Sequence, residues 1–114
     1  MKLVTAIFKP SRLDAVIDAL SEKGTAGLTV SEVRGYGRQQ GKTEVYRGAE
    51  YEVRLLPKVK VEVACSDDDA DGIADAIAQA ANTGTIGDGK IFIRGLDTVI
   101  RIRTGERGEQ AITG

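Results

Sequence analysis

The sequence has no histidine and a single cysteine among its 114 residues. Protein zinc sites are usually built from these two residue types, and Ser-His-Asp or Cys-His catalysis needs histidine, so both kinds of site are excluded. One cysteine cannot form a disulfide within the chain, which is typical of proteins of the reducing cytoplasm. Cys65 falls in phase with Val59, Val61 and Val63, and we therefore expect a packed thiol rather than a reactive one.

The chain also lacks an excess of either charge, since sixteen basic and seventeen acidic residues give a net charge of −1. Such a protein has no overall field that would draw it to nucleic acid. No apolar run is long enough to cross a membrane and the start has no signal-peptide pattern, so we expect a cytoplasmic protein. The length predicts one domain over residues 1–114, small enough for oligomerisation to add stability.

The first half of the chain predicts a strand, a helix and a second strand. Residues 2–9 are mostly apolar between two lysines and predict the first strand. Ser11 and Asp14 resemble a capping box, apolar residues then recur at helical spacing, and Gly24 stands where a C-cap belongs. Residues 28–36 predict the second strand.

The second half repeats this plan. Residues 58–65 alternate strictly between apolar and charged side chains and predict a strand. Ser66 and three following aspartates predict the start of a helix that Gly84 ends, and a strand follows from Lys90. A further strand is predicted over 99–103. The order is βαββαβ with an extra C-terminal strand, an α+β ferredoxin-like sandwich with two helices on one face of an antiparallel sheet.

One long polar segment, about residues 37–55, joins the second and third predicted strands. Loops of this length are uncommon in compact domains and are usually functional or disordered. A hairpin could form here, but Val45, Tyr46 and Tyr51 are too few apolar residues to pack it alone. We expect a mobile, functional loop. The glycine-containing, charged segment of about 104–114 is expected to be a frayed tail.

The segment Thr83-Gly-Thr-Ile-Gly-Asp-Gly-Lys90 is dense in glycine, which lets backbone N–H groups approach an anion closely. It fits the start of the P-loop pattern, but Ile91 stands where Ser or Thr would hold Mg²⁺, and a strand rather than a helix follows. It therefore predicts a phosphate loop of another design. The alternative is a helix C-cap followed by a tight turn, which explains Gly84 well and the other two glycines less well.

Four polar clusters meet if the predicted fold is right: residues 35–39, Lys58, residues 87–90, and the pair Arg101 and Arg103, which would leave one face of the last strand. Each cation alone is explained by a solvated surface with weak ion pairs. Together they favour a polyphosphate ligand, which suits bidentate arginine and point-charge lysine. The two glycines of the first cluster precede no helix, so the dinucleotide-binding fingerprint is excluded.

Three motifs carry a family resemblance: Thr43-Glu-Val-Tyr-Arg-Gly-Ala-Glu-Tyr51, Gly84 to Lys90, and Ile100-Arg-Ile-Arg-Thr-Gly-Glu-Arg-Gly-Glu109. In this order and spacing they resemble the PII signal-transduction proteins of nitrogen metabolism, and the resemblance covers essentially the whole chain. It implies a non-enzymatic regulator that is a homotrimer, with nucleotide sites in the clefts between subunits. ATP and ADP would compete for these clefts, and 2-oxoglutarate would bind only beside Mg-ATP.

The resemblance also implies roles for individual residues. Gln39 corresponds to the side chain that ligates Mg²⁺, Lys58 to the cation that pairs with a carboxylate of 2-oxoglutarate, and Gly41 lies at the same ligand. A dianion beside a triphosphate needs such a metal and lysine to offset repulsion. The positions implied at ATP or ADP are Thr29, Gly35, Gly37, Arg38, Gln39, Glu62, Gly87, Asp88, Gly89, Lys90, and, from the adjacent subunit, Arg101 and Arg103.

The long segment then corresponds to the T-loop, through which the family contacts its targets. Tyr51 matches a tyrosine that receives UMP or AMP in many members, and Arg47 matches an arginine that plugs ammonium channels. Ala49 excludes the serine phosphorylation of some relatives. The implied partners are a nitrogen-metabolism target such as an ammonium channel, a nucleotidyltransferase or a biosynthetic enzyme. No nucleic acid is implied, and the membrane is reached only through a channel.

Some residues depart from the family pattern. Gln40, Lys42 and Arg54 are unusual in the loop, and Lys9 stands where some relatives have arginine. Because main-chain amides supply much of the contact near residue 40, we expect 2-oxoglutarate binding to survive. The reversed charge at Arg54 leaves the target open.

Three alternative functions compete with this interpretation. An adenylate-energy sensor would keep nucleotide binding without a 2-oxoglutarate response. A slow ATPase would use the same site, but only Asp88 and Glu62 are nearby acids to orient water. RNA-recognition domains share the βαββαβ order, but the third strand, residues 58–65, has none of their stacking aromatics.

Overall fold

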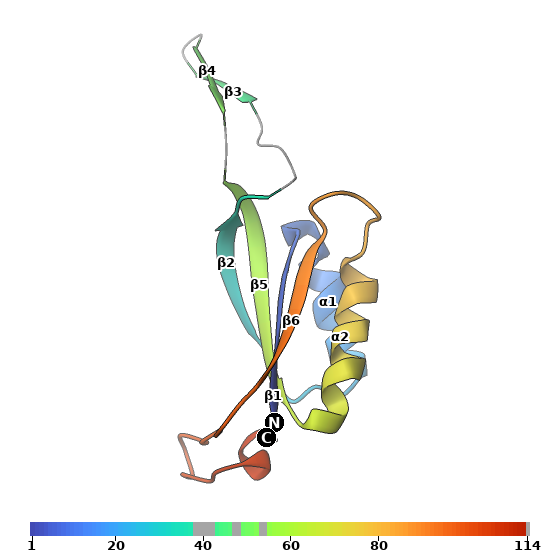
Figure 1. The fold of residues 1–114 in the computed structure, drawn as a ribbon, viewed down its shortest axis with the longest axis vertical. Coiled ribbons are helices and arrows are strands. Elements are labelled where there is room, and N and C mark those ends of the chain that lie inside the picture. The colour runs from blue at the N-terminus through green and yellow to red at the C-terminus, as the bar shows by residue number, and fades with distance from the viewer. Residues whose placement is uncertain (38–42, 47–48, 53–54, 114) are drawn as a thin grey trace.

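The computed structural model describes residues 1–37, 43–46, 49–52 and 55–113, with the backbone alone for 43–46 and 49–52. In chain order the elements are β1 (Lys2–Phe8), the 3₁₀ helix η1 (Pro10–Arg12), α1 (Leu13–Glu22), β2 (Thr29–Gly35), β3 (Thr43–Tyr46), β4 (Ala49–Glu52), β5 (Leu56–Cys65), α2 (Asp67–Ala81), β6 (Gly89–Gly95) and the 3₁₀ helix η2 (Glu109–Ala111). Four strands form an antiparallel sheet in the order β2-β5-β1-β6. Both helices cover one face of it, as the ferredoxin-like prediction requires (Figure 1).

The sheet owes its buried face to the alternation that the sequence predicts. β5 buries Val59, Val61, Val63 and Cys65. Val61 lies opposite Ala6 of β1, and Val63 lies opposite Val4. Val16 and Leu20 of α1 and Ile73 and Ile77 of α2 close the core from the helix side. Burial also raises the pKa of the Cys65 thiol, so the prediction of a packed cysteine is confirmed.

The start of α1 differs from the prediction. Ser11 and Asp14 do not form a capping box, because Pro10–Arg12 make a 3₁₀ turn and no side chain in the described part of the chain caps the helix. Instead, Arg12 donates from Nε (2.9 Å) and Nη2 (2.7 Å) to the carbonyl of Ala80 in the last turn of α2. One guanidinium group therefore ties the beginning of α1 to the end of α2.

The ends of both helices are close to the predicted ones. Gly24 follows α1 with φ of 76°, as a C-cap glycine does. α2 begins directly after Ser66 but ends at Ala81, and Asn82 rather than Gly84 is its C-cap. No helix among the described residues is long and apolar enough to span a membrane.

Part of the segment between β2 and β5 is a hairpin. β3 and β4 pair antiparallel from Thr43 opposite Glu52 to Tyr46 opposite Ala49. Among the described residues, the hairpin is a separate two-stranded sheet and pairs with none of the four strands of the main sheet. The hairpin that the sequence left open is therefore present in the described backbone.

The predicted strand over 99–103 is wrong. In the described part of the chain this segment forms only an isolated bridge, between Ile100 and Arg107, and is followed by turns and η2. Gly105 and Gly108 have φ of 73° and 84°, a region that glycine adopts readily, and they turn the chain back on itself. The two arginines of the segment therefore do not share the face of a strand.

Candidate functional site

The glycine-rich segment lies at one end of the sheet, where it joins α2 to β6 (Figure 1). Gly84, Gly87 and Gly89 have φ of 75°, 93° and 106°, which side-chain-bearing residues rarely adopt. A β-carbon on Gly89 would lie 1.8 Å from the carbonyl oxygen of Ile7. The last glycine is therefore required by the sheet itself, where β6 begins against β1.

Asp88 organises this segment through its carboxylate. Oδ2 accepts hydrogen bonds from the backbone N–H groups of Thr83 (2.8 Å) and Gly84 (2.9 Å), and Oδ1 accepts from the Thr83 hydroxyl. The ammonium group of Lys9 lies 3.3 Å from Oδ1 and donates to Thr85 Oγ1 at 2.5 Å. The bonds from Thr83, with those from Lys9 and Gly84, hold the pKa of Asp88 well below its usual range.

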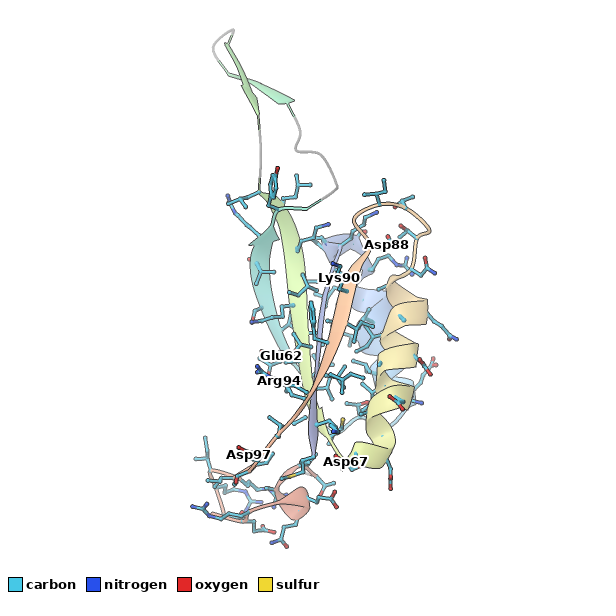
Figure 2. The ribbon with its side chains drawn as sticks, viewed as in Figure 1. Glu62, Asp67, Asp88, Lys90, Arg94 and Asp97 are labelled. Atoms are coloured by element: carbon cyan, nitrogen blue, oxygen red, sulfur yellow. The ribbon has the colours of Figure 1, made fainter. Side chains whose placement is uncertain are left out.

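Lys58 reaches the same segment from β5. Its Nζ donates to the carbonyl of Gly87 at 2.8 Å. Burial and the positive charge of Lys9 lower the pKa of Lys58, and the carboxylate of Asp88 partly offsets them. Lys90, the second residue of β6, lines the same cavity as Lys58 and Gly87, and Figure 2 shows it near Asp88. The prediction that Lys58 lies close to residues 87–90 is therefore confirmed by this hydrogen bond.

A cavity of about 650 Å³ opens between these segments, a size that suits a small-molecule ligand. It holds the predicted Gly35, Gly37, Lys58 and residues 87–90 together. Tyr36, Thr85 and Ile86 also line it and belong to the segments that the sequence analysis singled out. The remaining lining residues, Ile7, Leu56 and Phe92, were not assigned to a site by the sequence analysis. The signal in the sequence was Phe92, an aromatic residue in phase with Lys90 and Arg94 on its strand. In the structure this residue is 52% exposed.

Thr29 and Glu62 lie away from this cavity. They are paired across β2 and β5, on the sheet face that the helices leave open. The Thr5 hydroxyl donates to Glu62 Oε2 at 3.2 Å. Figure 2 shows Glu62 well along the sheet from Asp88 and Lys90. These two predicted site residues are therefore close to each other and separate from the glycine-rich segment.

The segment after β6 that carries Arg101 and Arg103 lies beyond the opposite end of the sheet from the glycine-rich segment (Figure 1, red). The Arg101 guanidinium donates to a carboxylate oxygen of Glu106 at 2.7 Å and to the carbonyls of Gln110 (2.6 Å) and Thr113. Arg103 is exposed. Within one chain, the predicted convergence of these arginines with the glycine-rich segment is therefore wrong. The segment after Arg103 is also not the expected frayed tail, because the hydrogen bonds from Arg101 fix it in place.

Several predicted site residues fall outside the described part of the chain. They are Arg38, Gln39, Gly41 and Arg47, together with the unusual loop residues Gln40, Lys42 and Arg54. Tyr51 is described only as backbone, within β4. Their predicted roles stay predictions.

Comparison with known proteins decides the family. The family model described as "Nitrogen regulatory protein P-II" matches residues 1–106. Nitrogen regulatory protein GlnK of Escherichia coli (strain K12) is 59% identical over 112 residues, covering 98% of this chain and 100% of the relative. The chain belongs to the P-II family. Nitrogen regulatory protein P-II of Rhizobium meliloti (strain 1021) and of Pasteurella multocida (strain Pm70) are 58% and 56% identical with the same coverage.

This membership confirms the function class that the three sequence motifs indicate. The chain is a P-II signal transducer of nitrogen regulation, and P-II proteins are regulators rather than enzymes. The likeness to GlnK extends over the glycine-rich segment, the hairpin and the C-terminal turn, since the match runs almost end to end.

Proposed function

We propose that this P-II protein binds ATP or ADP at the cavity that ends the sheet and signals the bound nucleotide to target proteins. The observation that carries the proposal is the pairing of a glycine-rich turn with Lys58 and Lys90 around one cavity. Backbone N–H groups of such a turn attract phosphate, and the lysines add point charges. Ile7 and Phe92 offer an apolar surface to a base.

The proposed nucleotide contacts include residues that the cavity does not bring together. In full they are Thr29, Gly35, Gly37, Arg38, Gln39, Glu62, Gly87, Asp88, Gly89, Lys90, Arg101 and Arg103. Because the two arginines lie at the far end of the same chain, a neighbouring copy must supply them. As the resemblance to P-II proteins implies, we propose that the assembly is a homotrimer with its nucleotide sites between subunits. Exposed apolar side chains such as Phe92 and Ile102, which is wholly exposed, support such assembly.

The second proposed ligand is 2-oxoglutarate, bound with Mg-ATP by Gln39, Gly41 and Lys58. When bound, Mg²⁺ supplies positive charge that offsets the repulsion between the triphosphate and the dicarboxylate. Lys58 supports this role, because its ammonium group already faces the cavity at the carbonyl of Gly87. A cation in this position can pair with a carboxylate that enters beside the nucleotide.

The output of the proposed sensor is the T-loop, residues 37–55. A ligand shifts the loop only if it binds one loop conformation more tightly than another. Arg47 and Tyr51 are the proposed contact and modification residues, and the proposed partners are an ammonium channel, a nucleotidyltransferase or a biosynthetic enzyme of nitrogen metabolism. The protein would act in the cytoplasm and reach the membrane only through a channel.

Calorimetric titration of 2-oxoglutarate tests the proposal, with Mg-ATP, with Mg-ADP and without nucleotide. Binding only in the presence of Mg-ATP would support the coupled sensor. Nucleotide binding without any 2-oxoglutarate response would favour the second candidate function, an adenylate-energy sensor. The unusual loop residues Gln40, Lys42 and Arg54 motivate this second candidate. Absence of nucleotide binding would overturn both, and steady release of phosphate from ATP would indicate a slow ATPase.

A further inference from the structure

Asp88 is the residue of the glycine-rich segment whose carboxylate accepts hydrogen bonds from within the same segment. Both oxygens accept hydrogen bonds from residues 83 and 84, and the side chain is only 23% exposed. A carboxylate beside a polyphosphate repels it unless its charge is neutralised. Lys9 supplies the neutralising charge at 3.3 Å, and its side chain is only 21% exposed.

We infer that Asp88 is a positioning residue and that Lys9 is its counter-ion, the two together holding residues 83–88 in the shape that receives phosphate. This inference rests on the proposed nucleotide binding. The pair crosses from the residue after β1 to the residue before β6, so it fixes the segment against the sheet. Lys9 also donates to Thr83 Oγ1 (3.3 Å) and Thr85 Oγ1 (2.5 Å), so one ammonium group contacts three residues of the loop.

The physical advantage is preorganisation. A loop that is already ordered by its own hydrogen bonds does not have to be ordered by the ligand, and the ligand's affinity rises accordingly. The lysine that neutralises Asp88 keeps this ordering from adding negative charge to the cavity. The Asp88 carboxylate therefore acts on the nucleotide through the loop and makes no phosphate contact, so the nucleotide contact proposed above for Asp88 falls to its backbone.

Charge alone predicts the opposite result, and this makes the inference testable. Asp88→Asn removes a negative charge near a polyphosphate, so a purely electrostatic effect would tighten ATP binding. Loss of the positioning bonds would weaken it. The double variant Lys9→Met/Asp88→Asn keeps the net charge of the pair at zero, so electrostatics predicts wild-type affinity and positioning predicts weaker binding.

The experiment is calorimetric titration of Mg-ATP into the full-length protein and its variants, with thermal unfolding of each as a check of the fold. We expect Asp88→Asn and the double variant to bind Mg-ATP about tenfold more weakly or worse. Lys9→Arg keeps the positive charge and the hydrogen-bond donors, and its affinity should stay within about twofold of wild type. Asp71→Asn, which removes an exposed acid from α2, is the matched control and should not change affinity.

The outcomes separate the inference from the function on which it rests. If the wild-type protein does not bind ATP, the proposed function is wrong and the inference falls with it. If the wild type binds and Asp88→Asn binds as tightly or more tightly, the inference alone is overturned. Should Asp88→Asn fail to fold, Thr83→Val carries the test, because it removes one donor to Asp88 and leaves both charges. Its affinity should fall about threefold or more, and an unchanged affinity would overturn the inference.

Discussion

The carbonyl oxygen of Ile7 occupies the space that a β-carbon on Gly89 would need, 1.8 Å away. Gly89 also has φ of 106°, so alanine would be both strained and in collision with β1. We expect Gly89→Ala to lower the free energy of unfolding by about 2–4 kcal/mol, measured by urea denaturation. Gly95→Ala, at the other end of β6, meets nothing within 4 Å and should be close to neutral. Equal losses at the two glycines would contradict this explanation.

Lys58 allows a matched comparison along one strand. Lys58→Met removes the ammonium group that faces Gly87, and we expect the affinity for 2-oxoglutarate in the presence of Mg-ATP to fall about tenfold or more. Lys60→Met removes the same charge two residues along β5, where Lys60 pairs with Glu62 at 3.8 Å, and should have a smaller effect. Calorimetry measures both, and a larger loss for Lys60→Met would count against the role given to Lys58.

Much of the fold was predictable because its local patterns and its packing agree. The alternation of β5 and the apolar stripes of the helices point to the faces that are buried, and Gly24 adopts the conformation of a C-cap. The meeting of Lys58 with residues 87–90 followed from the order of the elements alone. Such features depend on neighbours along one strand or helix and on topology.

The features that the sequence did not predict correctly share a different cause. Ile100 and Ile102 alternate with two arginines as a strand does, but a strand needs a partner, and alternation does not reveal whether a sheet edge is available. Within the residues that the structure describes, the segment forms only the single bridge between Ile100 and Arg107, and Ile102 remains wholly exposed. The orientation of the Asp88 carboxylate was equally hidden, because its partners Thr83 and Lys9 are chosen by tertiary structure.

The pKa of Asp88 predicts how its network responds to acid. A carboxyl group whose pKa is lower in the folded than in the unfolded protein stabilises the fold above its ordinary pKa of 3.8, and this stabilisation is lost as the pH falls below that value. Asp88→Asn should therefore destabilise the protein equally at pH 7 and pH 5 and by less at pH 3. Urea denaturation at the three pH values measures the difference. A difference that grew toward pH 3 would have the wrong sign.

Arg12 provides a test of the contact between the two helices. Arg12→Met removes both hydrogen bonds to the Ala80 carbonyl and leaves the end of α2 without this cation, so we expect a loss of about 1–2 kcal/mol in unfolding free energy. Arg34→Met, an exposed arginine of β2, is the control and should stay within about 0.5 kcal/mol of wild type. Equal effects would show that the loss is one of charge and not of the helix contact.

Arg101 and Arg103 make a pair of variants whose effects should separate. Arg101 bonds to Glu106 and to two carbonyls of the C-terminal segment, whereas Arg103 is exposed. If both arginines contact the nucleotide of a neighbouring subunit, each methionine substitution should weaken Mg-ATP binding. Only Arg101→Met should also lower the unfolding free energy, by about 1–3 kcal/mol, because it releases that segment. Calorimetry and urea denaturation of the same samples measure the two effects, and a stability loss shared by Arg103→Met would contradict the prediction.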